Sequence, residues 1–267
     1  MTVSELYLAL NERIPPSLSC EWDNDGLMCA PEPGRTVRRV LVTLDITDAA
    51  IEAAVSAHAD VILSHHPLIF RGVRHLTPDN AVAGRCIALC RAGIAAMSFH
   101  TRLDAVRGGV NDALADILGL ADCTALDGEA ALGRIGSLPA PLTGEELARH
   151  VCARLGTPGV LLSDAGCSIR RVAVVGGEGG DFIDAAKQAG ADAYISGRLG
   201  YHPMVDAPEN TLTLIEAGHF FTEQPVSSVL CRMVGEIDRT IAIDTFFSNR
   251  IRLVSSTEPS GNGAAQP

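Results

Sequence analysis

Arg38–Ser64 reads RRVLVTLDITDAAIEAAVSAHADVILS, and the chain contains a second copy of this stretch. The second copy, Arg170–Ser196, reads RRVAVVGGEGGDFIDAAKQAGADAYIS and is identical at 11 of 27 positions when the two are aligned without a gap. Each copy begins and ends with a short apolar run, and a helical pattern lies between them. Such runs are typical of buried strands, and strand, helix and strand with short joints indicate a parallel βαβ unit. The sequence therefore predicts an α/β protein with a duplicated core.

Further elements extend each copy. Thr2–Arg13 has the apolar spacing of a helix that Thr2 or Ser4 can cap and that Pro15 and Pro16 end. Thr47 or Asp48 can cap the helix inside the first copy. The remaining predicted strands are Val37–Leu44, Val61–Leu63, Ile94–Phe99, Val172–Val175, Ala193–Ile195 and Leu212–Ile215, and the later helices are Phe182–Ala189, Asn111–Leu118 and Glu223–Arg239.

The fold class that follows is α/β, with pseudo-duplicated βαβ halves packed as α/β/α layers around a central mixed sheet and a metal site between the halves. Residues 1–123 form the first α/β half and residues 169–254 the second. Residues 124–168 match neither copy, so we expect a connecting segment with small strands and a helix. The polar tail, residues 255–267, is expected to be disordered.

Composition excludes several classes of protein. A net charge of −11, without a basic run, argues against nucleic acid as a bulk partner, although a small anionic substrate stays compatible with it. No window approaches 18 uncharged apolar residues, and the first residues lack the pattern of a signal peptide, so we expect a cytoplasmic protein with no membrane span. The eight cysteines contain no CxxC, and Cys86 and Cys90 fit small core residues on one helix face.

Metal-type side chains follow the predicted strands. His65 and His66 come directly after Val61–Leu63, where ligands gather beyond the carboxyl ends of parallel strands. Pro67 holds His66 extended and bars a helix there. The alternative is a loop with two hydrogen-bonding histidines.

Each half also carries a histidine followed four residues later by a carboxylate, His100 with Asp104 and His219 with Glu223. Pro225 is tolerated only in the first turn of a helix, so we expect that helix to begin near Thr222. His219 would then lie at the strand end and Glu223 at the helix N-terminus, where a carboxylate is favoured.

The chemistry of these side chains limits which metal ions they can bind. Imidazole and carboxylate ligands suit zinc, iron or manganese and do not suit a thiolate cluster. One open catalytic ion needs fewer ligands than the five side chains of His65, His66, Asp104, His219 and Glu223, whereas two ions bridged by a carboxylate would use them all. That arrangement is the two-metal hydrolytic site.

Two loops allow more than one interpretation. Val175–Asp181 is glycine-rich, follows a strand and opens a helix, so Gly176–Gly180 either cradles a phosphate or forms a tight turn. Trp22–Gly26 holds the single tryptophan among polar turn residues, and it is either a packed loop or the wall of a pocket.

Five stretches together resemble the GTP cyclohydrolase I type 2 homologue family, also called Nif-three-like or dinuclear-metal-centre proteins. They are Trp22–Leu27 (WDNDGL), Leu63–Phe70 (LSHHPLIF), His100–Ala113 (HTRLDAVRGGVNDA), Ile195–His202 (ISGRLGYH) and Ala217–Glu223 (AGHFFTE). In that order they are highly specific and span most of the chain. The chain resembles the short form, without the inserted middle domain, and it departs from the family pattern at Asp25, Arg102 and Arg198.

The resemblance implies two divalent metal ions per chain and a ring-shaped homo-oligomer, a homohexamer, with its sites facing an inner cavity. The implied ligands are His65, His66, Asp104, His219 and Glu223, with Glu223 as the bridge. Arg102 and Arg198 either add positive charge near the site or lie at the surface.

The predicted function is that of a metal-dependent hydrolase acting on a nucleotide or another phosphate-bearing small molecule, with His100 or His202 as the group that transfers a proton. A second hypothesis is a non-catalytic, metal-stabilised protein that binds a partner or has a regulatory role. A third is a nucleotide-binding module built on Gly176–Gly180.

Overall fold

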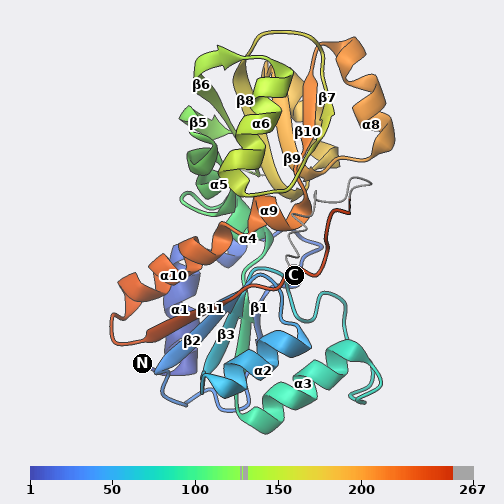
Figure 1. Cartoon of the computed structure of the whole chain (residues 1–267). Coiled ribbons are helices and arrows are strands. Elements are labelled where there is room, and N and C mark those ends of the chain that lie inside the picture. Colours follow the sequence, from blue (N-terminus) through green and yellow to red (C-terminus); the bar gives the residue numbers. More distant parts are fainter. Residues whose placement is uncertain (127, 129–131, 255–267) are drawn as a thin grey trace, which may run out of the picture.

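The computed structural model describes residues 1–126, 128 and 132–254. The described residues form two lobes that lie one above the other, each built on its own mixed sheet (Figure 1). The α/β class is therefore confirmed, but two sheets take the place of the single central sheet that the sequence suggested. The predicted tail, residues 255–267, lies outside the described residues.

The lower lobe contains a five-stranded sheet among the described residues, in the order β1-β4-β3-β2-β11. The neighbours β4, β3, β2 and β11 are parallel, and β1 is antiparallel to β4. The bounds are β1 Gly26–Cys29, β2 Arg39–Thr43, β3 Val61–Ser64, β4 Ala95–Ser98 and β11 Ala242–Phe246.

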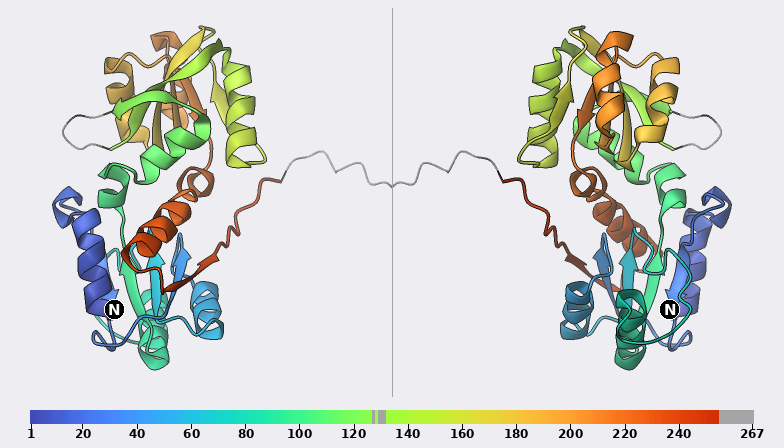
Figure 2. Two further views of the ribbon diagram at one scale, coloured as in Figure 1. Left: turned by 90° about the vertical axis from the view of Figure 1, so that its left-hand side faces the viewer. Right: turned by 90° about the vertical axis from the view of Figure 1, so that its right-hand side faces the viewer.

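Helices cover both faces of this sheet. Alternate strand residues point to opposite faces, so Val40 and Val42 pack under α1 and α10 while Leu41 packs under α2 and α3. The two side views show these layers on either side of the strands (Figure 2). The bounds are α1 Val3–Arg13, η1 Pro16–Leu18, α2 Asp48–Ser56, α3 Ala81–Ala92, α4 Thr101–Ala105 and α10 Val226–Ile237.

The upper lobe contains a six-stranded sheet within the described part of the chain, in the order β5-β6-β8-β9-β10-β7. Its three central strands β8, β9 and β10 are parallel. Side chains of α5 and α6 share one core with the sheet, and α7 and the segment after α8 share the other. The bounds are β5 Ala121–Ala125, β6 Arg134–Leu142, β7 Leu161–Ser163, β8 Ile169–Glu178, β9 Ala193–Arg198, β10 Thr213–Glu216, α5 Val110–Leu118, α6 Gly144–Leu155, α7 Ile183–Gln188, α8 Tyr201–Asp206, α9 His219–Glu223, η2 Gly180–Phe182 and η3 Pro208–Asn210.

The two copies of the sequence repeat form equivalent hydrogen bonds. In the first copy, Asp60 accepts hydrogen bonds from the backbone N–H groups of Arg38 and Arg39, at 2.7 and 3.1 Å. In the second copy, Asp192 accepts the same bonds from Arg170 and Arg171, at 2.9 and 2.7 Å. A carboxylate that satisfies two backbone donors at the start of the neighbouring strand fixes the joint between helix and strand, so both copies retain it.

The local elements largely follow the predicted pattern. Thr2 caps α1 in a capping box with Glu5, and Thr47 caps α2 by accepting from the Ala50 N–H. The predicted strands and helices are present with bounds that shift by a few residues. One segment differs: His219 and Glu223 both lie in the short helix α9, which ends before Pro225, so the helical turn begins earlier than Thr222.

The chain passes between the lobes twice. It leaves the lower lobe between α4 and α5, and it returns between α9 and α10. The division into residues 1–123, 124–168 and 169–254 therefore does not follow the sheets. Strands β5, β6 and β7 all join the upper sheet, whereas α10 and β11 complete the lower one.

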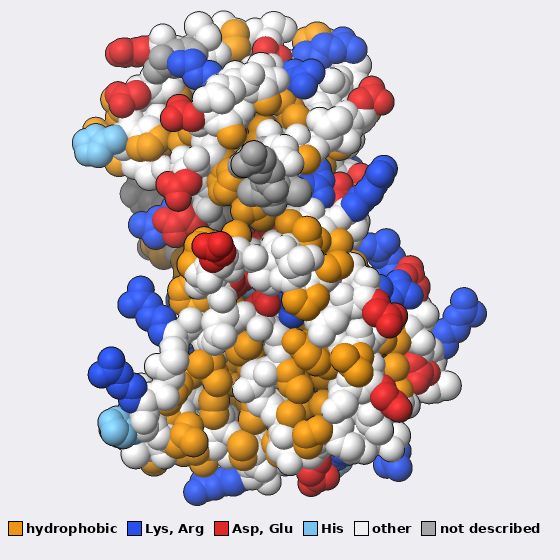
Figure 3. All heavy atoms as spheres, turned by 180° about the vertical axis from the view of Figure 1, so that it is seen from behind, with side chains coloured by type: hydrophobic (Ala, Val, Ile, Leu, Met, Phe, Trp, Pro, Cys, Tyr) orange, Lys and Arg blue, Asp and Glu red, His pale blue; other side chains and the backbone are white. Residues whose placement is uncertain are grey.

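The face opposite that of Figure 1 carries interspersed acidic and basic side chains, while hydrophobic side chains gather over the lower lobe (Figure 3). None of the helices in the described residues is long and apolar enough to cross a membrane.

The return of α10 into the lower lobe gives a stability prediction. Leu230 is fully buried in the core that α10 shares with α1 and the sheet. Leu230→Ala should lower the free energy of unfolding by about 2–5 kcal/mol, since it leaves a cavity. Leu8→Ala on α1, where the side chain is 61% exposed, should stay within about 0.5 kcal/mol of wild type. Denaturant unfolding measures both, and equal losses would contradict this packing.

Candidate metal centre

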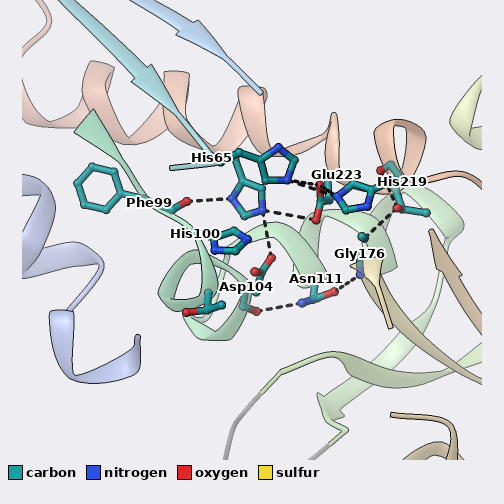
Figure 4. A network of polar contacts seen from close by, with 12 residues as sticks. His65, Phe99, His100, Asp104, Asn111, Gly176, His219 and Glu223 are labelled. Atoms are coloured by element: carbon teal, nitrogen blue, oxygen red, sulfur yellow. Dashed lines mark hydrogen bonds and ion pairs between the residues drawn. The ribbon is translucent and has the colours of Figure 1, made fainter. Parts of the chain in front are cut away.

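All five predicted ligands meet where the two lobes join. His65 and His66 lie in the loop after β3, Asp104 lies in α4, and His219 and Glu223 lie in α9 (Figure 4). Each segment follows the carboxyl end of a parallel strand, which is where backbone leaves the sheet and side chains are free to converge. The structure therefore brings residues from both halves of the chain into one cluster.

His65 is completely buried and held in one orientation. Its Nδ1 lies 2.9 Å from the Phe99 carbonyl oxygen, which can only accept, so Nδ1 must donate the hydrogen bond. Its Nε2 then faces the two carboxylates, 3.6 Å from Asp104 Oδ1 and 3.7 Å from Glu223 Oε1. A backbone carbonyl that fixes the tautomer in this way is a common support of a metal-binding imidazole.

His66 has a carboxylate behind it. Its Nδ1 lies 2.8 Å from Asp45 Oδ1, and its Nε2 lies 2.9 Å from Glu223 Oε2. His219 Nε2 reaches the same oxygen at 2.8 Å and lies 3.3 Å from His66 Nε2. His66, His219 and Glu223 thus place three candidate ligand atoms within 4.8 Å of one another. Asp45 was not predicted as a site residue, because nothing in the sequence around it marks it as a partner of His66.

Glu223 fits only because residue 177 is glycine. A Cβ on Gly177 would lie 2.0 Å from Glu223 Oε1, and its φ of +69° is a conformation that other residues rarely adopt. The glycine-rich stretch therefore makes room for a buried carboxylate.

The same stretch offers few free amides for a phosphate. Gly176 N donates to Asn111 Oδ1, Gly177 N donates to Thr222 Oγ1, and Gly179 N donates to the Arg198 carbonyl. A phosphate cradle needs such amides to point at the ligand. The structure therefore favours the tight turn over the phosphate-binding loop.

The residues present fit a bound cation. Two of their atoms, His65 Nε2 and Asp104 Oδ1, are buried without a hydrogen-bond partner, and the buried Glu223 Oε2 faces the ring nitrogens of His66 and His219 without a well-aligned hydrogen bond. Buried polar atoms are normally paired, and here imidazole and carboxylate atoms face one another without a directed hydrogen bond. Nitrogen and carboxylate donors arranged in this way are typical ligands of zinc, iron or manganese.

His100 belongs to the same cluster. Its Nδ1 lies 2.9 Å from Asp23 Oδ1, and one of its ring nitrogens lies within 4.8 Å of those of His65 and His66. Asp23 orients the ring as Asp45 orients His66. His100 is therefore placed either to exchange a proton or to act as an additional ligand.

His202 is placed differently. It is exposed at the start of α8, where the centroid of its ring lies 5.4 Å from that of Tyr201. Its role in proton transfer stays a prediction. Arg198, one of the departures from the family pattern, is exposed and lies 4.0 Å from Glu178.

The other two departures form a pair. Arg102 is buried and donates from Nε to Asp25 Oδ2 at 2.9 Å, from Nη1 to Asn11 Oδ1 at 2.7 Å, and it lies over the Phe99 ring. Asp25 also accepts from the His100 N–H. Each residue compensates the charge of the other. Arg102 therefore stabilises the loop beneath the cluster, and its guanidinium group contacts protein atoms.

Asn111 is a further residue that sequence reasoning did not single out. Its Nδ2 donates to the Asp104 carbonyl at 3.1 Å, and its Oδ1 accepts from the Gly176 N–H at 2.8 Å (Figure 4). It therefore joins the ligand-bearing α4 to β8 of the upper lobe. The sequence feature that could have identified Asn111 is its position within His100–Ala113, one of the five stretches that resemble the family.

The charges of the cluster depend on one another. Burial raises the pKa of Glu223, but His219, His65 and His66 outweigh it and hold the pKa well below its usual range. Burial and the nearby Glu223 raise the pKa of Asp104 to about 6, against the opposing effect of His65. Burial lowers the pKa of His66, yet Asp45 and Glu223 raise it to about 10.

Comparisons with known proteins point to one family of relatives. The sequence profile of the family described as Duf34/NIF3 (NGG1p interacting factor 3) matches residues 1–252. A Clostridium perfringens protein named GTP cyclohydrolase 1 type 2 homolog is 34% identical over 232 residues, covering 85% of this chain and 88% of that protein. A Nostoc protein of the same name is 38% identical over 202 residues, covering 73% and 77%. The crystal structure of a Bacillus cereus protein related to NIF3 covers 96% of this chain and 99% of its own, with a TM-score of 0.86 and 23% identity.

The raised pKa of His66 predicts that metal binding releases protons. With a pKa of about 10, the His66 imidazole carries a proton at pH 7, and a metal requires the unprotonated ring. The apparent affinity for zinc should therefore rise as pH increases toward that value. Calorimetric titration in two buffers of different ionisation enthalpy measures the release, which should be on the order of one proton larger in wild type than in His66→Ala. Equal heats in both buffers would contradict it.

Proposed function

The chain belongs to the Duf34/NIF3 family, and from the geometry of its site we propose that it binds two divalent metal ions and acts as a metal-dependent hydrolase. The observation that carries the proposal is the position of Glu223. Its Oε1 faces His65, and its Oε2 faces His66 and His219. A carboxylate whose two oxygens face two separate groups of ligands is suited to bridge two ions.

The remaining ligands divide accordingly. Asp104 and His65 lie on the Oε1 side, and His66 and His219 lie on the Oε2 side. Each group combines imidazole nitrogen with carboxylate oxygen, which supports zinc, iron or manganese as the bound ions.

Two ions held there would supply Lewis acidity, which activates water as a nucleophile near neutral pH and offsets negative charge on a substrate. His100 would hold or move a proton at Nε2, because Asp23 engages its Nδ1. The Asp23 carboxylate is itself fixed by the backbone N–H and the hydroxyl of Thr101, so the imidazole keeps one orientation.

The substrate in this proposal is a nucleotide or another phosphate-bearing small molecule. The names of the relatives, GTP cyclohydrolase 1 type 2 homolog, support a nucleotide, and cationic ions at the site favour an anionic ligand.

A second function is supported by a separate observation. The site lies at both passages of the chain between the lobes, and Asn111 joins α4 to β8 beside it. Ions held there would also fasten the lobes together, as they would in a non-catalytic, metal-stabilised protein that binds a partner or has a regulatory role. The ring-shaped homohexamer and the cytoplasmic location stay predictions.

Metal content tests the ligand assignment. Glu223→Ala should lose both ions, since the bridging carboxylate serves each, whereas His65→Ala and His66→Ala should each retain about one ion per chain. His202→Ala is the matched control and should keep the full content, because that ring is exposed on α8. Elemental analysis of folded variants at equal concentration measures the ratios. Retention of both ions by Glu223→Ala would exclude the bridge.

Turnover separates the two functions. Nucleotide or phosphoester hydrolysis by the purified protein should stop on chelation and return with zinc, iron or manganese. His100→Gln should lower the rate by about 100-fold or more while metal content stays unchanged, as expected for a proton-transfer group. A melting temperature that falls on chelation, without turnover of any nucleotide, phosphoester or cyclic amide, would instead favour the non-catalytic function.

A further inference from the structure

Two aromatic rings beside the candidate metal centre face solvent. Trp22 is 63% exposed and Phe70 is 44% exposed. Their ring centroids lie 6.1 Å apart with the planes inclined at 70°, and each ring lies 6.2 Å from His100. Large aromatic side chains are usually buried, so an exposed pair next to a polar site marks a binding surface.

The backbone that carries Trp22 is held by its neighbours. Asp23 accepts from the Thr101 N–H at 3.0 Å and from the Thr101 hydroxyl at 2.6 Å, and it binds His100. Asn24 donates from Nδ2 to the Ile69 carbonyl, which ties this loop to the one that carries Phe70. The two rings are therefore presented by loops that polar contacts fix, and the rings themselves are not needed to hold the loops.

The alternative explanation is that both rings serve packing. Neither Trp22 nor Phe70 belongs to a hydrophobic core among the residues that the structure describes. A packed loop would bury its one tryptophan, because the burial of a large apolar ring stabilises the fold most. The exposed fraction of Trp22 therefore counts against the packed loop.

The rings form a continuous path to the metal ligands. Trp22 and Phe70 contact His100, and the His100 ring lies 5.2 Å from that of His65 and 5.7 Å from that of His66. A ligand that places an anionic group at the ions would thus bring its other end to the two exposed rings.

We propose that Trp22 and Phe70 form a subsite that binds a planar heteroaromatic ring, such as the purine of a nucleotide, while the phosphate end of the ligand lies at the metal centre. Stacking against an aromatic side chain suits any flat base and contributes useful affinity without directed hydrogen bonds. This subsite rests on the proposed function for the position of the phosphate, but ring binding by itself needs no turnover.

Trp22 is the single tryptophan of the chain, so its fluorescence reports on this subsite alone. Titration of the metal-loaded, full-length protein with guanosine monophosphate should quench the emission with saturation, whereas ribose 5-phosphate, which lacks the ring, should leave it unquenched. Guanosine, which lacks the phosphate, should quench it before and after chelation.

Variants assign the contact to the ring. Trp22→Ala should weaken binding of guanosine monophosphate by about 10-fold or more, measured by calorimetry, while ribose 5-phosphate affinity and metal content stay unchanged. Trp22→Phe should retain most of the affinity because it keeps a flat ring. Leu76→Ala, at a side chain that is 69% exposed, is the matched surface control and should bind as wild type does.

The outcomes separate this subsite from the proposed function. If guanosine quenches the fluorescence with saturation but the protein hydrolyses no nucleotide, the subsite is supported and only the proposed hydrolase activity is contradicted. Equal losses of guanosine monophosphate and ribose 5-phosphate affinity in Trp22→Ala would overturn the subsite, and so would the absence of saturable guanosine monophosphate binding to the metal-loaded protein.

Discussion

A carboxylate buried between two lobes is the constraint around which this molecule is arranged. Glu223 has a side chain that is almost fully buried, and a charge in that position is costly unless partners of opposite charge surround it. Three imidazoles supply those partners, and they come from segments far apart in the sequence. The Glu223 carboxylate occupies the space that a Cβ at residue 177 would fill, so only glycine fits at that position. The lobes, the loop after β3 and the end of β8 all meet this one group.

Duplication explains how the two lobes produce such a meeting place. Each copy of the repeat delivers parallel strands whose carboxyl ends lie at the junction of the lobes, and Asp60 and Asp192 fix the same joint in each copy. The chain then passes between the lobes beside the ligands, at α4 and at α9. Ligands carried on short helices after strands are well oriented, because the sheets beneath them are rigid.

The two halves of the chain nevertheless contribute unequally to the cluster. The first half supplies His65, His66 and Asp104, together with the neighbouring His100 and the exposed rings of Trp22 and Phe70. The second supplies His219 and Glu223, and its glycines bring the backbone close to the carboxylate. The buried pair of Arg102 and Asp25 also lies in the first half, where it joins α4 to the loop that carries Trp22.

Local pattern was enough to identify the strands of both βαβ units, several of the helices and the types of candidate ligand, but it did not predict β1 or β11 and gave no bounds for α3. Thr2 and Thr47 cap helices as their sequences indicate, and His65 and His66 follow the end of β3, where Pro67 bars a helix. Those features depend on neighbours a few residues away. The sheet to which each strand belongs was decided by tertiary contacts. One central sheet became two, and α10 and β11 returned to the first lobe, since strand partners and core contacts join residues far apart in the chain. The same holds for Asp45 behind His66, Asn111 between the lobes and the separate position of His202: their partners are set by tertiary packing, which no local spacing records.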